Sequence, residues 1–272
     1  MKRCWKARPH DLEQVLAEGP EMIEIHATSE DLAKDLSVKS DLQVAVHFPE
    51  YDGQTLMDPA SLDEAQRLKA SNFYQRCLDK TRDWGSRFRG TPKAIIHPGG
   101  WSSEPMRPAD KTAALEQFGK TMGELNAVGV DFLVENMPPF PWFYGGQWNC
   151  NFFMEPRECR DVCMGMGWGF CFDACHAALW CRSVDNAVTL EQYAMLVAPV
   201  TAHAHISGAK GKDGEGVTFE EGDVDMGPVV RRLAARNVGM SLEIWQSHHD
   251  GFKKVIDGWK AIDAMLDCSI HE

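Results

Sequence analysis

Short apolar runs alternate with longer amphipathic segments along the whole chain. The apolar runs predict strands at residues 21–26, 42–48, 93–97, 130–135, 169–173, 201–206 and 239–244. The segments between them predict helices at residues 10–18, 61–83, 108–127, 155–166, 189–197, 225–236 and 251–266. Alternation of this kind indicates parallel βαβ units. An eighth strand would have to come from the first half-dozen residues, where the pattern is weak.

Six of the predicted strands end on a carboxylate or an imidazole. The side chains at these ends are His47, His97, Glu135, Asp173 with His176, His203 with His205, and Glu243. Burying so many polar groups together is costly unless they share a partner, and a divalent cation is a common one. Closure of the sheet would bring all six ends around one axis, at the face where parallel barrels carry their active sites. We therefore predict an α/β fold, a (β/α)8 TIM barrel forming a single domain over residues 1–272.

Composition narrows the class of protein. The 272 residues are 44% hydrophobic and 25% charged, which is typical of a soluble globular chain with a sizeable core. The sequence contains no apolar run near the roughly 20 residues that span a bilayer, and its beginning does not resemble a signal peptide. Nine cysteines without a C-x-x-C pair predict a reduced, cytoplasmic setting. The net charge of −12 disfavours nucleic-acid and membrane partners.

Two long connections follow predicted strands. Residues 137–154 are rich in aromatic residues, proline and glycine, whereas residues 207–224 are glycine-rich and charged. Long loops in compact domains are usually functional or disordered, and the aromatic content of the first argues against disorder. We expect the 137–154 segment to be a lid or a subunit contact.

The strand ends also predict the kind of metal site. Glu135, Asp173, His205 and Glu243 together offer three carboxylates and one imidazole, a set that suits Mn²⁺, Mg²⁺, Co²⁺ or Fe²⁺, with Zn²⁺ also compatible. Each of these residues alone is more often a helix cap, an ion-pair partner or a core histidine. His203 and Cys171 are expected to be such core residues, and His248 with His249 a solvated loop. The recurrence at successive strand ends is what indicates a site.

The order of these motifs resembles a known superfamily. The series V-H-F-P-E-Y, I-H-P-G, V-E-N-M, F-D-A-C-H, A-H-I-S and S-L-E-I, followed over roughly residues 20–265, is similar to the xylose-isomerase-like TIM barrels. This superfamily includes sugar-phosphate isomerases and epimerases, ketose 3-epimerases, inosose dehydratase, hydroxypyruvate isomerase and endonuclease IV. The resemblance implies that Glu135, Asp173, His205 and Glu243 bind a metal and that Glu135 and Glu243 are an acid/base pair. It also implies a homo-oligomer, a dimer or a tetramer.

The expected activity is metal-dependent isomerisation or epimerisation of a small sugar or polyol-type carbonyl compound. A cation would stabilise the enediolate formed when one glutamate removes a proton and the other returns it. The sequence does not choose between epimerisation and aldose–ketose isomerisation. Residues expected to contact the substrate are His47, His97, His176, Lys210 and Trp142, with Phe143 and Trp148 also able to stack on a sugar ring. We see no arginine at a predicted strand end, which favours an unphosphorylated substrate.

Three alternatives remain open. An endonuclease IV-like abasic-site phosphodiesterase would use three zinc ions, and His47, His97 and His176 stand where additional ligands are expected. Its third site needs an Asp-x-His after His205, where this chain reads GAKGKDGEGV. A dehydratase or lyase would share the enolate but expel a hydroxyl group. A barrel that only binds a ligand or a partner protein would need no metal.

Overall fold

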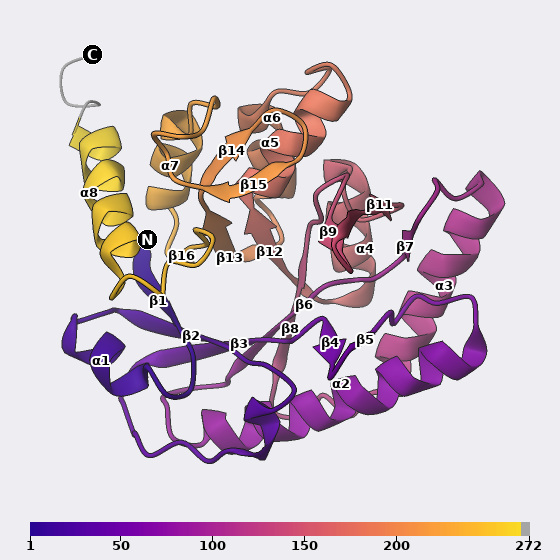
Figure 1. Cartoon of the computed structure of the whole chain (residues 1–272), viewed down its shortest axis with the longest axis horizontal. Helices are drawn as coiled ribbons and strands as arrows, with labels where there is room; N and C mark the ends of the chain where they lie inside the picture. Colours follow the sequence, from indigo (N-terminus) through magenta and orange to yellow (C-terminus); the bar gives the residue numbers. More distant parts are fainter. Residues whose placement is uncertain (268–272) are drawn as a thin grey trace.

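Eight parallel strands close into a barrel. The structure is a computed structural model and describes residues 1–267 (Figure 1). The strands follow one another around the barrel in the order β1-β16-β13-β12-β8-β6-β3-β2. Their bounds are β1 (Lys2–Ala7), β2 (Met22–His26), β3 (Gln43–His47), β6 (Lys93–Ile96), β8 (Asp131–Glu135), β12 (Gly169–Asp173), β13 (Thr201–Ile206) and β16 (Gly239–Leu242). The predicted (β/α)8 barrel is therefore confirmed.

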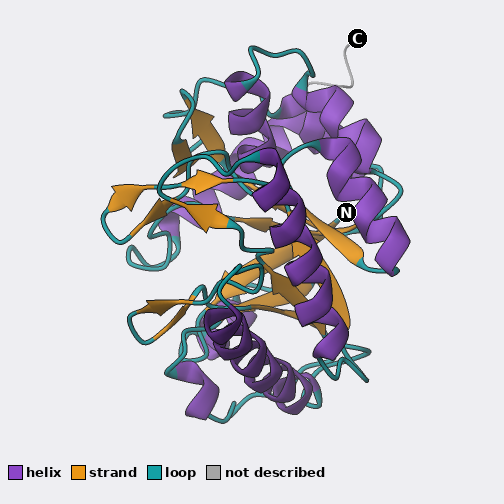
Figure 2. Ribbon diagram, turned by 90° about the vertical axis from the view of Figure 1, so that its right-hand side faces the viewer, coloured by secondary structure: helices purple, strands orange, loops and turns teal. Residues whose placement is uncertain are grey.

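Helices follow the strands and flank the barrel (Figure 2). They are α1 (Leu12–Ala17), α2 (Glu64–Gly85), α3 (Pro108–Glu124), α4 (Pro156–Met166), α5 (Ala174–Ser183), α6 (Leu190–Val197), α7 (Gly227–Ala234) and α8 (Lys253–Asp267), with a short 3₁₀ turn at Asp31–Ala33. All seven expected helices are present. The sequence did not predict α5, because its apolar residues continue the run of β12 and it begins directly after that strand.

The strand with the weak pattern, β1, closes the barrel. It pairs in parallel with β16 and with β2. Two of its charged side chains, Lys2 and Lys6, are partly or largely shielded from solvent and form polar contacts inside the fold. A strand that carries lysines at such positions does not show the continuous apolar run of a buried parallel strand.

The barrel interior has an apolar floor beneath a polar layer. One buried cluster consists of Cys4, Met22, Ala45, Ile95, Leu133 and Cys171, each on a different strand. Side chains two residues apart on a strand point to the same face. The residue two positions beyond each floor residue is therefore also interior, and these residues are Lys6, Glu24, His47, His97, Glu135 and Asp173. The same spacing relates His203 to His205, and the expected core positions of Cys171 and His203 agree with their complete burial.

The two long connections contain small sheets at the end of the barrel where the strands finish. Segment 137–154 includes β9 (Trp142–Phe143), β10 (Gly146–Gln147) and β11 (Asn149–Cys150), and β11 pairs with β7 (Trp101–Ser102). Segment 207–224 forms the hairpin of β14 (Gly208–Lys210) and β15 (Gly214–Val217). A further hairpin, β4 (Tyr51–Asp52) with β5 (Thr55–Leu56), follows β3. The lid or subunit-contact role of segment 137–154 stays a prediction.

Two further observations concern the cysteines and the length and polarity of the helices. Every cysteine in residues 1–267 is free and buried. Within the described residues, no helix is both long enough and apolar enough to cross a membrane.

Candidate active site

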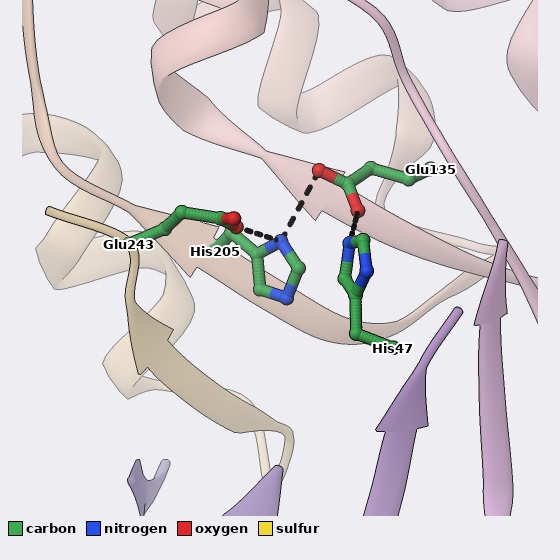
Figure 3. Close-up of side chains that lie close together, drawn as sticks. All are labelled: His47, Glu135, His205 and Glu243. Atoms are coloured by element: carbon green, nitrogen blue, oxygen red, sulfur yellow. Dashed lines mark hydrogen bonds and ion pairs between the residues drawn. The ribbon is translucent and has the colours of Figure 1, made fainter. Parts of the chain in front are cut away.

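The four residues expected to share a cation lie around one imidazole nitrogen, and Figure 3 shows three of them, Glu135, His205 and Glu243. Nδ1 of His205 lies 2.7 Å from Oε2 of Glu243 and 3.2 Å from Oε1 of Glu135. Its distance to Oδ2 of Asp173 is 3.9 Å. The residues come from β8, β12, β13 and the position just after β16, so barrel closure brings them together from distant parts of the chain.

Asp173 is held in place by its own backbone environment. Its side chain caps α5 by accepting a hydrogen bond from the backbone N–H of His176 at 2.6 Å. Its backbone N–H and carbonyl are both bonded to the buried amide side chain of Asn136. The D-x-x-H spacing therefore fixes one carboxylate oxygen at the helix start and leaves the other facing His205.

Three further histidines surround Glu135. Nε2 of His47 lies 3.1 Å and Nε2 of His97 3.5 Å from Oε2 of Glu135, while Nδ1 of His176 lies 3.6 Å from Oε1. His47 is buried beneath the cavity, whereas His97 and His176 line it. These three histidines and His205 thus all lie within 3.6 Å of an oxygen of Glu135.

Sequence reasoning missed the charged residues behind His205. Oε2 of Glu24 lies 2.9 Å from Nε2 of His205 and 2.8 Å from Nε2 of His203. Nζ of Lys6 lies 3.0 Å from Oε1 of Glu24 and 2.7 Å from Oε1 of Glu243. Glu24 is fully buried in the middle of β2, and the sequence gives no indication that it pairs with groups from two other strands, β1 and β13.

The pKa values follow from burial and from this network. Burial opposes ionisation of Glu135, yet His205, His47 and His97 hold its pKa well below the ordinary value. Burial likewise opposes ionisation of Glu243, and Lys6 and His205 lower its pKa. Burial raises the pKa of Asp173 to about 6, and the negative charges of Glu135 and Glu243 add to the effect. Three carboxylates thus lie close together, and the positive charges of Lys6 and His205 offset part of their mutual repulsion.

The donor atoms fit a divalent cation. Ligand atoms of His47, Glu135, His205 and Glu243 all lie within 4.8 Å of one another, and those of Glu135, Asp173 and His176 form a second such group. Oε2 of Glu243 is buried and, within residues 1–267, has no hydrogen bond despite its short distance to His205. Carboxylate oxygens and imidazole nitrogens converging in this way suit Mn²⁺, Fe²⁺, Co²⁺ or Zn²⁺.

A cavity of about 470 Å³ opens above this cluster. Glu243 borders it with 30% of its side chain exposed. Trp142 and Phe143, expected to contact a substrate, line the cavity, whereas Lys210 is exposed on β14 and neither it nor Trp148 lines the cavity. The cavity is also lined by Lys6, Arg8, His26, Glu215, Trp245, His248 and His249.

Glu215 is a second residue that the sequence did not single out. It lies on β15, and its Oε2 is 3.6 Å from Nε2 of His176. Burial raises its pKa. One acidic residue in a glycine-rich charged loop has no distinguishing pattern, so only the folded hairpin reveals that it faces the cavity.

The family follows from comparison with known proteins. The family model described as xylose isomerase-like TIM barrel matches residues 11–264, and the chain belongs to this family. No curated protein is similar enough to count as a match.

Solved structures share the fold at low sequence identity. A D-tagatose 3-epimerase-like protein has a TM-score of 0.69 and 16% identity, covering 99% of this chain and 100% of its own. A 3-keto-D-glucoside 4-epimerase from E. coli has a TM-score of 0.63 and 12% identity, covering 95% and 100%. Endonuclease IV from Thermus thermophilus has a TM-score of 0.61 and 14% identity, covering 98% and 99%. These structural similarities establish the fold. At such low sequence identity they do not establish the reaction, which depends on the residues of the site.

Proposed function

We propose that the protein is a metal-dependent isomerase or epimerase of a small polyhydroxy carbonyl compound. The observation that carries the proposal is the arrangement of Glu135 and Glu243, whose carboxylates both approach Nδ1 of His205 from different strands. Structures with the same fold include several sugar epimerases. The cavity above the cluster has the size of a small-molecule site.

The metal would be held by Glu135, Asp173, Nδ1 of His205 and Glu243. When bound, a divalent cation supplies positive charge that polarises a carbonyl group and stabilises the enediolate formed on deprotonation. Glu24 would hold the opposite nitrogen of His205 and so fix the orientation of that ring.

The proton transfers would belong to the two glutamates. Glu243 borders the cavity and has a depressed pKa, so it is ionised and able to accept a proton from a substrate carbon. Glu135, which approaches the same Nδ1 of His205 from β8, would return or remove the second proton. Lys6 contacts Glu243 at 2.7 Å and stabilises its ionised form. His97, His176 and Trp142 would orient the hydroxyl groups and cover the sugar.

The proposal is tested by proton exchange. Purified protein loaded with Mn²⁺ is incubated with a panel of ketoses and aldoses in D₂O, and the products are followed by NMR and mass spectrometry. Incorporation of one deuterium into an isomerised or epimerised product supports the proposal. Loss of water would instead identify a dehydratase, and absence of any bound divalent metal by elemental analysis would contradict a metal-dependent enzyme.

A phosphodiesterase is the second candidate, because three additional histidines surround Glu135 and two potential cation groups share that carboxylate. Two observations count against it. The 207–224 segment contains no histidine, and its Asp213 and Asp223 contact Gln147 and Arg182. The net charge of −12 also repels a nucleic-acid backbone. Catalytic cleavage of abasic duplex DNA at low salt would favour this candidate over the isomerase.

A further inference from the structure

Arg8 stands at a strand end that the sequence pattern did not reveal. It directly follows β1 and lines the cavity above the candidate metal centre. Its Nη1 donates a hydrogen bond to the backbone carbonyl of His26 at 3.0 Å, which orients the guanidinium group. Among residues 1–267, no carboxylate forms an ion pair with Arg8. The expectation of an unphosphorylated substrate depended on the absence of an arginine from the predicted strand ends. Arg8 lies directly after β1, so that premise was wrong.

Other basic side chains line the cavity beside Arg8. We define the basic wall as Lys6, Arg8, His26, His248 and His249. Burial lowers the pKa of His26, and the charges of Lys6 and Arg8 lower it further. Burial, His249 and Arg8 lower the pKa of His248 in the same way. Lys6 and Arg8 therefore carry the positive charge of this wall, whereas Glu50, Asp173, Glu215 and Glu243 line other parts of the same cavity.

Arg8 and Lys6 differ in how far nearby carboxylates balance their positive charges. Both oxygens that Lys6 reaches belong to Glu24 and Glu243, so two carboxylates offset its charge. Within the described residues, the backbone carbonyl of His26 is the only hydrogen-bond acceptor of Arg8. Several N–H groups of its planar guanidinium remain for a ligand, and this fork matches the two oxygens of a carboxylate or a phosphate.

We propose that the substrate carries an anionic group, a carboxylate or a phosphate monoester, and that Arg8 binds this group at the cavity wall. The proposal rests on the proposed function, in which the carbonyl end of the substrate lies at Glu135 and Glu243. It deepens that function by naming the substrate class: a polyhydroxy carbonyl compound with a charged end.

The position of Arg8 after β1 indicates how such a substrate would be oriented. Lys6 touches Glu243, and Arg8 follows Lys6 by two residues along the direction of β1. Two residues of extended chain advance about 7 Å, so Arg8 is attached one repeat further towards the barrel mouth. We therefore expect the anionic group to lie closer to the barrel mouth than the reacting carbon. Trp142 and Trp245 line the cavity and can cover the chain between them.

The test compares three six-carbon ligands, one neutral and two with an anionic group on a terminal carbon. D-sorbitol is neutral, D-gluconate carries a carboxylate, and D-sorbitol 6-phosphate carries a phosphate. Their binding is measured by isothermal titration at constant ionic strength, with and without Mn²⁺, for the wild type, Arg8→Gln and Arg89→Gln. Arg89 is exposed in the loop that precedes β6, and its replacement removes the same charge without touching the cavity.

We expect one anionic ligand to bind the wild type about tenfold or more tightly than sorbitol, as a charge-assisted hydrogen bond requires. The anion that binds more tightly identifies the carboxylate or the phosphate. The preference should disappear in Arg8→Gln and persist in Arg89→Gln. Equal binding of the three ligands, or an unchanged preference in Arg8→Gln, would overturn the proposal.

Thermal unfolding separates this role from a structural one. If Arg8 only supports the loop through His26, Arg8→Gln lowers the melting temperature and leaves the ligand preference intact, which contradicts the proposal. The two proposals also fail separately. Turnover of neutral sugars without anion preference would remove the Arg8 proposal alone, whereas Arg8-dependent anion binding without any isomerisation would remove the proposed reaction alone.

Discussion

Glu24 contacts the imidazole of His205 on the side opposite the candidate metal centre. Its Oε2 lies 2.9 Å from Nε2, while Nδ1 of the same ring faces Glu243 at 2.7 Å. A carboxylate behind a histidine fixes the ring orientation and increases the basicity of the nitrogen that binds a metal. Both groups are fully buried, so the arrangement is shielded from solvent.

This relationship predicts the effect of removing the charge of Glu24. Glu24→Gln preserves the shape of the side chain but weakens its hold on His205, and we expect Mn²⁺ affinity to fall by about 10–100-fold. Isothermal titration measures the effect. Glu18→Gln, an exposed substitution after α1, is the matched control and should bind like the wild type. Unchanged affinity in Glu24→Gln would show that the contact does not support a metal ligand.

Removal of the metal should destabilise the folded protein. A ligand at 100 times its dissociation constant stabilises the folded state by about 2.7 kcal/mol, so chelation should lower the melting temperature and added Mn²⁺ should restore it. Asp173→Asn is the informative variant, because asparagine also caps helices well but loses the charge. We expect it to fold and to show little stabilisation by Mn²⁺. A wild-type response would exclude Asp173 from the ligand set.

Glu243→Gln should reduce turnover while much of the metal is retained. Loss of a positioned general acid/base costs about 10²–10⁴-fold in rate, and three of the proposed ligands remain in this variant. Steady-state kinetics and elemental analysis are measured on the same sample. Glu220→Gln, exposed in the 207–224 segment, controls for the change in charge. A wild-type rate in Glu243→Gln would end the assignment of this residue as an acid/base group.

The packing of the barrel floor gives a prediction that is independent of function. A Cβ atom added to Gly239 would lie 2.5 Å from Sδ of Met22 and 2.7 Å from Nδ1 of His203. Gly239→Ala should therefore reduce the free energy of unfolding by about 1–3 kcal/mol. Gly123→Ala, in an exposed turn of α3 with open space around it, should be neutral or stabilising by up to about 1 kcal/mol. Denaturant titrations of both variants test the contrast, and equal stabilities would contradict the packing.

Local pattern predicted much of this fold because most strands of a parallel barrel are apolar runs with polar ends. It was weakest at β1, where Lys6 is interior only because Glu24 and Glu243 offset its charge. The local sequence pattern did not indicate a role for Glu24, whose partners come from β1 and β13. Arg8 was not predicted to lie at a strand end, because the weak pattern of β1 did not show where that strand ends. These residues depend on contacts across the barrel, which spacing along the chain does not encode.

The central claim is that Glu135, Asp173, His205 and Glu243 bind one cation. A crystal structure of the protein grown with Mn²⁺, with anomalous data collected at the manganese edge, tests it most directly. The account predicts an anomalous peak within about 2.0–2.3 Å of a donor atom from each of the four residues. No peak among these side chains, or one bound by other residues alone, would contradict it.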